Sequence, residues 1–381
     1  MSDEHGSRFV AGQMRPLVPD GLEALVAYEP GAKPNLAAGE IHSALASNEN
    51  PFGPSPSAVL AMSKVLEEQH RYPPDGLELR ERLAALNGLG VEHVVLGNGS
   101  TELINLAVRT FVKSPERALR SETTFVMYKL AMAAAGVPCD VVPNRRDHSD
   151  DIEGLCAAAS CQTKLVLLSN PNNPTGTYVS QAELERLANA LPKDAIILHD
   201  EAYREFVTAD DYADGVRLLK SRPRVMVMRT FSKAHGLAGV RIGYALADPA
   251  IAQGLRRACP PFNINSIAMV AALAALEDSA WLAANIRRCN AARQELLRLC
   301  RALGLRCTDS QTNFVLVDLA RPADDACNFL AKNGILVRSM SPFGLPHHVR
   351  ISVGTASNLA SLERALTSCL ASTPPLDVPE A

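Results

Sequence analysis

The chain lacks the features that mark several large classes of protein. Its nine cysteines include no Cys-x-x-Cys pair, and this spacing predicts reduced thiols in the cytoplasm. His347 and His348 are adjacent but have no cysteine or histidine cluster around them, so we predict no metal site. The formal net charge is −3, with 38 basic and 41 acidic residues and no long run of one sign. Nucleic acid and anionic membrane surfaces are therefore poor candidates for partners.

Long hydrophobic runs are missing as well. No apolar stretch is long enough to span a bilayer, and residues 1–13 are polar, without the apolar centre of a secretory signal. Hydrophobic residues nevertheless make up 47% of the 381 residues, which is enough to bury a large core and to build two domains. We therefore expect a cytoplasmic protein with small molecules as its partners.

Strand-like and helix-like segments alternate through the first part of the chain, as at 101–111 and 181–190 for helices. The strand-like runs lie at 91–96, 138–142, 165–168, 196–199, 225–228 and 242–246. This order predicts an α/β fold with a mostly parallel sheet covered by helices. After residue 261 the pattern changes to a long helix at 280–303, strands at 313–317, 335–338 and 349–353, and helices near 324–332 and 359–370.

The change of pattern predicts three parts. Residues 1–44 form an N-terminal arm that packs on the small domain or on a partner subunit. Residues 45–262 form a large domain, and residues 263–381 form a smaller α+β domain. The proline-rich tail at 373–379 is expected to be disordered.

Lys233 lies in a run with a hydroxyl and a cation at fixed spacing. Ser232 precedes it directly, and Arg241 follows eight residues later. A lysine that attacks an aldehyde must be neutral, so it needs neighbours that lower its pKa. The run resembles the cofactor-anchoring segment of pyridoxal-phosphate enzymes, in which the hydroxyl and the arginine bind the cofactor's phosphate. The same spacing also arises by chance in unrelated chains.

Two apolar runs nearer the N-terminus end in polar turns. One leads into Asn170-Pro-Asn-Asn-Pro-Thr-Gly176 and the other into Asp200-Glu-Ala-Tyr203. Ligands of open α/β sheets bind at the carboxyl ends of the strands, where such turns lie. The first turn is alternatively an ordinary loop before a helix that Ser180 and Glu183 would cap. Asp200 is alternatively an exposed acid at a strand end.

In a pyridoxal-phosphate site these turns have separate uses. Asn173 would donate a hydrogen bond to the phenolic oxygen of the ring. Tyr203 would share that oxygen, because it follows Asp200 by about one helical turn. Asp200 would keep the pyridine nitrogen protonated, and the protonated ring is the electron sink that stabilises a carbanion at the substrate's α-carbon.

A glycine-containing turn precedes these two polar turns in the sequence. The segment Val94-Val-Leu-Gly-Asn-Gly-Ser-Thr-Glu102 is typical of a strand, a turn and a helix start. Backbone N–H groups at a helix N-terminus bind phosphate, and glycine lets the backbone come close. We therefore expect Gly99, Ser100 and Thr101 at a phosphate group. The turn lacks Gly-Lys-Ser/Thr, so it is not a nucleotide P-loop.

In this order and at these spacings, the four segments resemble fold type I pyridoxal-phosphate aminotransferases, and most of all the histidinol-phosphate aminotransferase family. The resemblance covers nearly the whole chain and implies a large domain with a mostly parallel sheet and a smaller α+β domain. Further segments that fit the family are Tyr28-Glu-Pro-Gly-Ala-Lys-Pro34, Ser47-Asn-Glu-Asn-Pro-Phe-Gly-Pro54, Arg71-Tyr-Pro73, Gly334-Ile-Leu-Val-Arg338 and Val349-Arg-Ile-Ser-Val-Gly354.

Position by position, the resemblance implies a pyridoxal 5'-phosphate enzyme with Lys233 as the Schiff-base residue. Phe125 would stack on the cofactor ring, where a tyrosine is frequent in the family. Tyr72 matches a tyrosine that reaches the cofactor phosphate of the neighbouring subunit, which implies a homodimer with a shared active site. His235 departs from the pattern, since an aromatic residue is common there. The implied phosphate ligands are Ser100, Thr101, Ser232 and Arg241.

The resemblance also places two arginines at the substrate. Arg350 matches the arginine that binds the α-carboxylate or its equivalent. Arg338 matches one that holds the phosphate of histidinol phosphate, with Tyr28 and Asn50 near it; alternatively, Arg338 ends a strand and pairs with a surface acid. The implied reaction transfers an amino group from histidinol phosphate to 2-oxoglutarate, as in histidine biosynthesis. Aromatic amino-acid aminotransferases and threonine-phosphate decarboxylases have similar motifs and are the alternatives.

Overall fold

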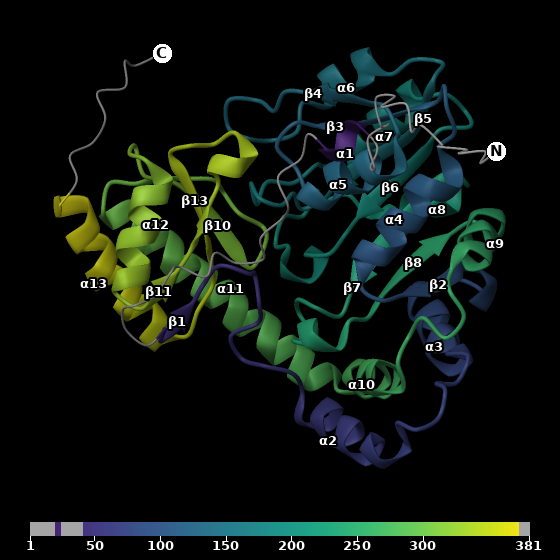
Figure 1. Ribbon diagram of the computed structural model, residues 1–381, viewed down its shortest axis with the longest axis horizontal. Helices are drawn as coiled ribbons and strands as arrows, with labels where there is room; N and C mark the ends of the chain where they lie inside the picture. Colours follow the sequence, from purple (N-terminus) through teal and green to yellow (C-terminus); the bar gives the residue numbers. More distant parts are fainter. Residues whose placement is uncertain (1–19, 24–40, 373–381) are drawn as a thin grey trace, which may run out of the picture.

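The structure is a computed structural model that describes residues 20–23 and 41–372 (Figure 1). Its centre is a seven-stranded sheet in the order β2-β8-β7-β6-β5-β3-β4. The strands from β7 to β4 run parallel, whereas β8 is antiparallel to both of its neighbours. The bounds are β2 (Val94–Gly97), β3 (Arg117–Ser121), β4 (Cys139–Val142), β5 (Thr163–Ser169), β6 (Ile196–Asp200), β7 (Val225–Thr230) and β8 (Gly243–Ala247).

Helices cover both faces of this sheet, as expected for its hydrophobic strands. Alternate residues of β5 show the division: Leu168 packs in one core cluster and Leu167 in the other. The second cluster is covered by α4 (Ser100–Phe111), α5 (Val126–Ala135) and α9 (Pro249–Ala258). The first is covered by α2 (Pro56–Lys64), α3 (Leu77–Asn87), α6 (Ile152–Ala158), α7 (Gln181–Ala190), α8 (Gly215–Ser221) and α10 (Ser266–Glu277). The α/β fold class is thus confirmed.

The second part of the structure is smaller and mixed. The 24-residue helix α11 (Ser279–Ala302) runs from the large sheet to a four-stranded antiparallel sheet in the order β12-β13-β10-β9 (Figure 1). A separate core cluster joins this small sheet to its helices. Its elements are β9 (Arg306–Cys307), β10 (Phe314–Asp318), α12 (Ala323–Lys332), β12 (Arg338–Ser339), β13 (His348–Ser352) and α13 (Ala356–Ser372).

The strand expected at 335–338 is divided between two sheets. Its first half is β11 (Ile335–Leu336), which pairs in parallel with β1 (Ser43–Ala44), and its second half is β12. The end of the expected N-terminal arm therefore joins the smaller part of the fold. Residues 1–19 and 24–40, the rest of that arm, lie outside the described residues, as does the tail at 373–381.

The strand β3 was not expected from the sequence. Its residues Arg-Ala-Leu-Arg-Ser carry two cations, which mask the apolar pattern. Arg117 forms an ion pair with Asp140 of the neighbouring strand, with 2.6 Å between Nη2 and Oδ1. Arg120 donates from Nη1 to the main-chain carbonyl of Ser121. Both guanidinium groups thus have partners, which permits them in a strand inside the sheet.

The helix α10 packs in the core of the large sheet, and α11 follows it after a bend of 85°. Among the described residues, no single helix is long and apolar enough to cross a membrane, although this bent pair meets that test by length and composition. The expected division of the chain at residues 262 and 263 stays a prediction.

Candidate active site

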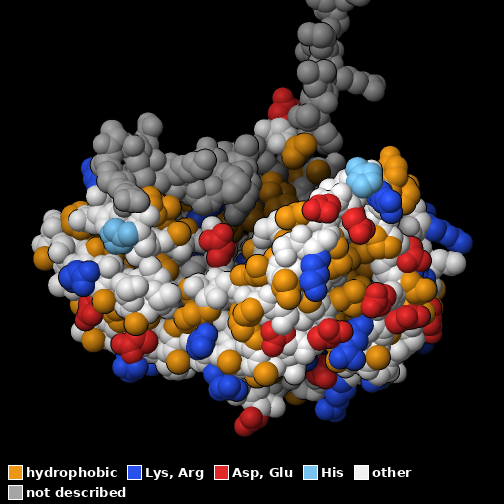
Figure 2. All heavy atoms as spheres, turned by 90° about the horizontal axis from the view of Figure 1, so that it is seen from below, with side chains coloured by type: hydrophobic (Ala, Val, Ile, Leu, Met, Phe, Trp, Pro, Cys, Tyr) orange, Lys and Arg blue, Asp and Glu red, His pale blue; other side chains and the backbone are white. Residues whose placement is uncertain are grey.

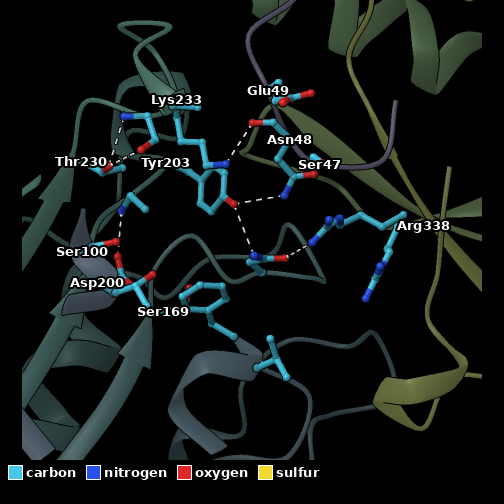
Figure 3. A pocket seen from close by; sticks show the side chains of 18 of the residues that line it. Ser47, Asn48, Glu49, Ser100, Ser169, Asp200, Tyr203, Thr230, Lys233 and Arg338 are labelled. Atoms are coloured by element: carbon cyan, nitrogen blue, oxygen red, sulfur yellow. Dashed lines mark hydrogen bonds between the residues drawn. The ribbon is translucent and has the colours of Figure 1, made fainter. Parts of the chain in front are cut away.

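The carboxyl ends of the central parallel strands meet at one edge of the large sheet. Ser169 ends β5 and is the register partner of Asp200, which ends β6. Lys233 follows the end of β7 by a short turn. A cavity of about 300 Å³ opens at this edge, within the size range of small-molecule sites (Figure 3). The functional groups that follow β5, β6 and β7 in the sequence therefore lie next to one another at this edge of the sheet.

Lys233 points into this cavity (Figure 3). Its Nζ donates to the main-chain carbonyl of Asn48 at 3.1 Å and lies 5.7 Å from the centre of the Tyr203 ring. Burial lowers the pKa of the Lys233 amine to about 8, and the charges of Arg350 and Arg241 lower it as well. A large fraction of the amine is therefore neutral near pH 8, which a nucleophilic lysine requires.

Asp200 is held from two sides. Tyr128 donates to its Oδ2 at 3.1 Å, and the Ala202 N–H donates to its Oδ1 at 3.1 Å. Burial raises the pKa of the Asp200 carboxyl to about 6, while the hydrogen bond from Tyr128 acts to lower it. Asp200 is not the exposed acid of the alternative interpretation, since it is almost fully buried.

Asn173 and Tyr203 meet at one point of the cavity. Asn173 Nδ2 donates to Tyr203 Oη at 3.3 Å, and Asn48 Nδ2 donates to the same oxygen at 3.1 Å (Figure 3). The sequence predicted this meeting through a helical turn after Asp200. The structure instead has a short turn followed by a 3-10 helix, η3 (Arg204–Phe206).

The turn before Asn173 and the helix after it agree with both interpretations. Asn173 lines the cavity, and α7 begins with the expected capping box. The Glu183 N–H donates to Ser180 Oγ, and the Ser180 N–H donates to the Glu183 carboxylate. The capping box is therefore confirmed.

The N-terminus of α4 lies at the same cavity. Gly99 has φ +77°, and a Cβ at this position would collide with Nη2 of Arg241. Gly243 approaches just as closely, because a Cβ there would lie 2.7 Å from the Ser100 nitrogen. These glycines let the helix N-terminus and a guanidinium group meet without an intervening side chain. Ser100, Thr101, Ser232 and Arg241 all line the cavity.

Two buried arginines form the opposite wall. Arg338 of β12 and Arg350 of β13 are register partners on adjacent strands, and only 9% and 8% of their surfaces are exposed. Arg350 donates from Nη1 to Asn173 Oδ1 at 2.6 Å and from Nη2 to the Ala46 carbonyl at 2.8 Å. Arg338 thus lies inside the cavity (Figure 3). The alternative interpretation required it to lie at the surface.

Some predicted site residues lie elsewhere. Tyr72 is 80% exposed and stacks on Phe262, with 4.6 Å between ring centres. Asn50 Nδ2 donates to the main-chain carbonyls of Lys233 and Ala234, so it stabilises the backbone turn that carries Lys233. Tyr28 lies outside the described residues. Phe125 does line the cavity, in contact with Tyr128.

His235 occupies the place where an aromatic residue was expected. Its ring lies 4.8 Å from the ring of Phe231. Burial lowers the pKa of His235 to about 4, so the imidazole is neutral and packs like an aromatic ring. The His235 side chain therefore contributes to packing next to the turn that carries Lys233.

Sequence reasoning missed two residues that hold the site together. Asn48 accepts from Lys233 and donates to Tyr203, and its φ is +53°. Tyr128 anchors Asp200. Tyr128 follows Phe125 by three residues, a helical spacing that would have placed both rings on one side of α5. No local pattern indicates the role of Asn48, because its partners lie more than 150 residues away.

The model of the family "Aminotransferase class I and II" matches residues 41–368. The chain belongs to this family. Within the aminotransferases it is a member of the histidinol-phosphate aminotransferase group. It is 41% identical over 363 residues to "Histidinol-phosphate aminotransferase" of Anaeromyxobacter sp., which covers 93% of this chain and 98% of the relative. It is 37% identical over 369 residues to "Histidinol-phosphate aminotransferase 2" of Pseudomonas fluorescens, which covers 95% and 100%.

A solved aminotransferase structure has the same fold. The histidinol-phosphate aminotransferase from Sinorhizobium meliloti in complex with pyridoxal-5'-phosphate superposes with a TM-score of 0.86 at 30% identity and covers 94% of this chain and 99% of that chain. This chain is thus a pyridoxal-phosphate-dependent aminotransferase of fold type I.

The residues of the cavity fit the chemical groups of pyridoxal phosphate. Its phosphate requires donors and a cation, and the cavity has a helix N-terminus beside Arg241. Its aldehyde requires an amine of lowered pKa, which is Lys233. Its basic ring nitrogen requires a carboxylate, and Asp200 is buried beside Ser169. In the described part of the chain, no group of three or more side chains is placed to hold a metal ion.

Proposed function

We propose that this enzyme transfers the amino group of histidinol phosphate to 2-oxoglutarate. The observation that carries the proposal is the pair Arg338 and Arg350, side by side on neighbouring strands and both facing the cavity. The donor presents a phosphate and the acceptor presents two carboxylates, so both substrates need fixed cations in the same cavity. The names of the relatives at 37% and 41% identity support the same substrate.

The cofactor would be held at both of its ends. Ser100, Thr101, Ser232 and Arg241 would bind its phosphate, while Asp200 would pair with its ring nitrogen. On the remaining sides of the ring, Phe125 would stack against one face, and Asn173 and Tyr203 would donate to the phenolic oxygen. When bound, pyridoxal phosphate supplies an electron sink that stabilises negative charge at the substrate's α-carbon.

Lys233 would move the proton in this reaction. Its pKa, lowered to about 8, leaves the freed amine able to take a proton from the substrate's α-carbon as a general base. Nζ donates to the Asn48 carbonyl at 3.1 Å, which positions the amine in the cavity. The protonated amine would then serve as the general acid that returns the proton. A positioned proton carrier of this kind contributes roughly 100- to 10,000-fold in rate.

Arg350 would orient the carboxylate and Arg338 the phosphate. Arg350 is already fixed by its bonds to Asn173 and the Ala46 carbonyl, so its guanidinium plane is held in one orientation. A planar donor group recognises a carboxylate with two parallel hydrogen bonds. Arg338 lies beside it on β12 and lines the same cavity. The two cations would thus provide two neighbouring anion positions in one cavity.

The test compares two substitutions with three substrates. Hydrogen bonds to charged groups contribute about 1.5 to 3 kcal/mol, or roughly 10- to 150-fold. We expect Arg338→Ala to lower kcat/KM for histidinol phosphate by about this factor and to leave any activity on phenylalanine nearly unchanged. Arg350→Ala should instead weaken the reaction of glutamate. The exposed Arg364→Ala is the matched control and should change neither value.

Two outcomes would replace the proposal. If the wild-type enzyme prefers an aromatic amino acid, or if Arg338→Ala leaves histidinol phosphate untouched, the enzyme is an aromatic amino-acid aminotransferase. Release of carbon dioxide from threonine phosphate would make it a decarboxylase instead. Both activities use the same cofactor, so pyridoxal-phosphate content does not distinguish them.

We also propose that the enzyme is a homodimer in the cytoplasm. Tyr72 and Phe262 are stacked on each other yet 80% and 59% exposed, which leaves two aromatic rings without a cover. Figure 2 views the molecule from the side of α2 and shows hydrophobic side chains at the surface among charged ones. All nine cysteines are free thiols, as is usual in a reducing compartment. Other exposed hydrophobic residues are Val59, Leu60 and Leu66.

A further inference from the structure

Cys300 and Cys307 are close together, away from the active site. Cys300 lies in the last turn of α11 and is fully buried, while Cys307 ends β9 and is partly buried against the same core cluster. The chain reverses between them. The Leu303 N–H and the Leu305 N–H both donate to the Cys300 carbonyl, at 3.2 Å and 3.0 Å, and Gly304 has φ +75°. This tight turn folds β9 back onto the helix end and brings the two thiols together.

The two thiols pack against the same core cluster and interact with each other. The Cys307 S–H itself donates to the Leu305 carbonyl at 3.9 Å. The interaction with Cys300 and the charge of Arg301 lower the pKa of Cys307, whereas the interaction with Cys307 and burial raise the pKa of Cys300. Cys300 is fully buried, so Cys307 is the thiol of the pair that reagents reach first.

Small molecules can reach Cys307 from outside. It lines a second cavity, of about 590 Å³, between the loop at 146–149 and the small sheet. The rim of this cavity is open to solvent, because the side chains of Arg306 and Asp309 are 80% and 89% exposed. The active-site cavity has a different set of lining residues. Cys307 is therefore both accessible to small molecules and the thiol of the pair with the lowered pKa.

We propose that Cys307 and Cys300 form a redox modification site, at which a peroxide oxidises Cys307 and Cys300 then closes a reversible disulfide. The proposal does not depend on the substrate of the transamination reaction. It assigns to this chain a dithiol that reacts in two steps at a cavity that shares no lining residue with the active-site cavity.

Hydrogen peroxide supplies the oxidising equivalents for both steps. The Cys307 thiolate attacks one oxygen of hydrogen peroxide, the O–O bond breaks, and the products are the Cys307 sulfenic acid and hydroxide. The Cys300 sulfur then attacks the Cys307 sulfur, an S–S bond forms, the S–O bond breaks, and the Cys300 proton leaves with that oxygen as water. Overall, two thiols are oxidised and one peroxide is reduced to two molecules of water. A dithiol reductant reverses the modification.

A second buried pair provides an internal control. Cys327 of α12 and Cys369 of α13 lie near each other in the same core cluster. Burial raises the pKa of Cys327 to about 12 and also raises that of Cys369. Neither thiol lines the second cavity. The pair therefore shares a core cluster, as Cys300 and Cys307 do, but neither thiol has access to the cavity or a lowered pKa.

The experiment treats the holoenzyme with hydrogen peroxide and maps its peptides by mass spectrometry without reduction. We expect a link between Cys300 and Cys307 that dithiothreitol removes, with Cys327 and Cys369 still free. Peroxide that oxidises the exposed Cys161 while Cys300 and Cys307 stay unlinked would overturn the proposal. So would a link that forms between Cys327 and Cys369 first. These wild-type measurements do not depend on the folding of any variant.

Two variants assign the order of the steps. In Cys300→Ser the second step is blocked, so a dimedone probe should label the sulfenic acid at Cys307. In Cys307→Ser the nucleophile is lost, so the probe should leave Cys300 unlabelled. Labelling of Cys300 in Cys307→Ser would show that the roles are wrong and that burial does not protect it.

Discussion

The phenol of Tyr128 donates a hydrogen bond of 3.1 Å to Oδ2 of Asp200, and both side chains are buried beneath the active-site cavity. The Ala202 N–H donates to Oδ1, so both oxygens of the carboxylate are held by hydrogen bonds. Burial and the Asp200 charge raise the pKa of Tyr128 well above its usual value, so the phenol stays a donor at every pH at which the enzyme works. Tyr128 is thus a positioning residue for the carboxylate.

We expect Tyr128→Phe to lower kcat and to move the acidic limb of the kcat profile to higher pH. The hydrogen bond favours the ionised form of Asp200, so its loss should raise a carboxyl pKa that burial has already raised to about 6. The loss in kcat should reach about 10-fold or more, from the 1.5 to 3 kcal/mol of a bond to a charged group. A pH series of initial rates measures both effects.

A surface pair of the same kind is the control. Tyr178 Oη donates to Asp211 Oδ1 at 2.7 Å at an exposed position. Tyr178→Phe should leave the pH profile in place. An acidic limb that stays fixed in Tyr128→Phe would reduce Tyr128 to a packing role.

Asp200→Asn should lower kcat by orders of magnitude while the cofactor remains bound. An amide does not keep the ring nitrogen protonated, and a neutral ring stabilises negative charge at the α-carbon far less. The contacts proposed for the cofactor's phosphate are untouched by this change, so absorbance of the purified variant should still show bound cofactor. Asp211→Asn is the surface control. Near-normal turnover in Asp200→Asn would remove Asp200 from this role.

The lowered pKa of Lys233 predicts how the enzyme without cofactor reacts with aldehydes. The charged form is disfavoured by burial, so the amine should lose its proton near pH 8 and not near its usual pKa of 10.5. The rate at which pyridoxal phosphate becomes attached should therefore rise with pH and level off above about 8. Attachment is measured by borohydride reduction and peptide mapping.

The same experiment separates the causes of the shift. Arg350 is the largest charge effect that lowers this pKa after burial, so Arg350→Met should move the midpoint to higher pH. Lys233→Ala should abolish attachment, and the exposed Lys129 should stay unmodified. A midpoint that Arg350→Met leaves in place would mean that burial alone sets the pKa.

The proposed shared site predicts complementation between two inactive variants. If Tyr72 completes the partner's site, mixing Lys233→Ala with a severe Tyr72 variant should restore activity in hybrid dimers. One site of each hybrid carries both defects, and the other carries neither. Each hybrid dimer has one intact site for its two chains, so its activity should approach about half that of a wild-type dimer. The activity is measured after refolding of the mixture. No recovery after demonstrated subunit exchange would argue against a composite site.

The sequence predicted much of the site because local patterns determine it. Apolar runs that end in Asn173 and Asp200 were expected to be strands of one parallel sheet, and parallel strands place their carboxyl ends at one edge. The glycine turn at Gly99 was expected at a helix N-terminus, where it lies. These inferences need only the order of the elements.

Contacts between distant segments were not predictable in this way. Asn48 meets Tyr203 and Lys233 across a gap of more than 150 residues, and nothing in its neighbours indicates these partners. The strand β3 was hidden by two arginines whose partners lie on other segments or on the main chain. The split of 335–338 between two sheets likewise depends on β1, which lies near the other end of the chain.

The main-chain oxygen of Asn48 accepts from Lys233 Nζ at 3.1 Å and from Asn313 Nδ2, beside β10 of the small sheet, at 3.0 Å. One atom therefore joins the amine of the large sheet to the small sheet. The same small sheet also carries Arg350, whose charge lowers the pKa of Lys233. The small sheet thus supplies both a contact that positions the lysine and a charge that favours its neutral form.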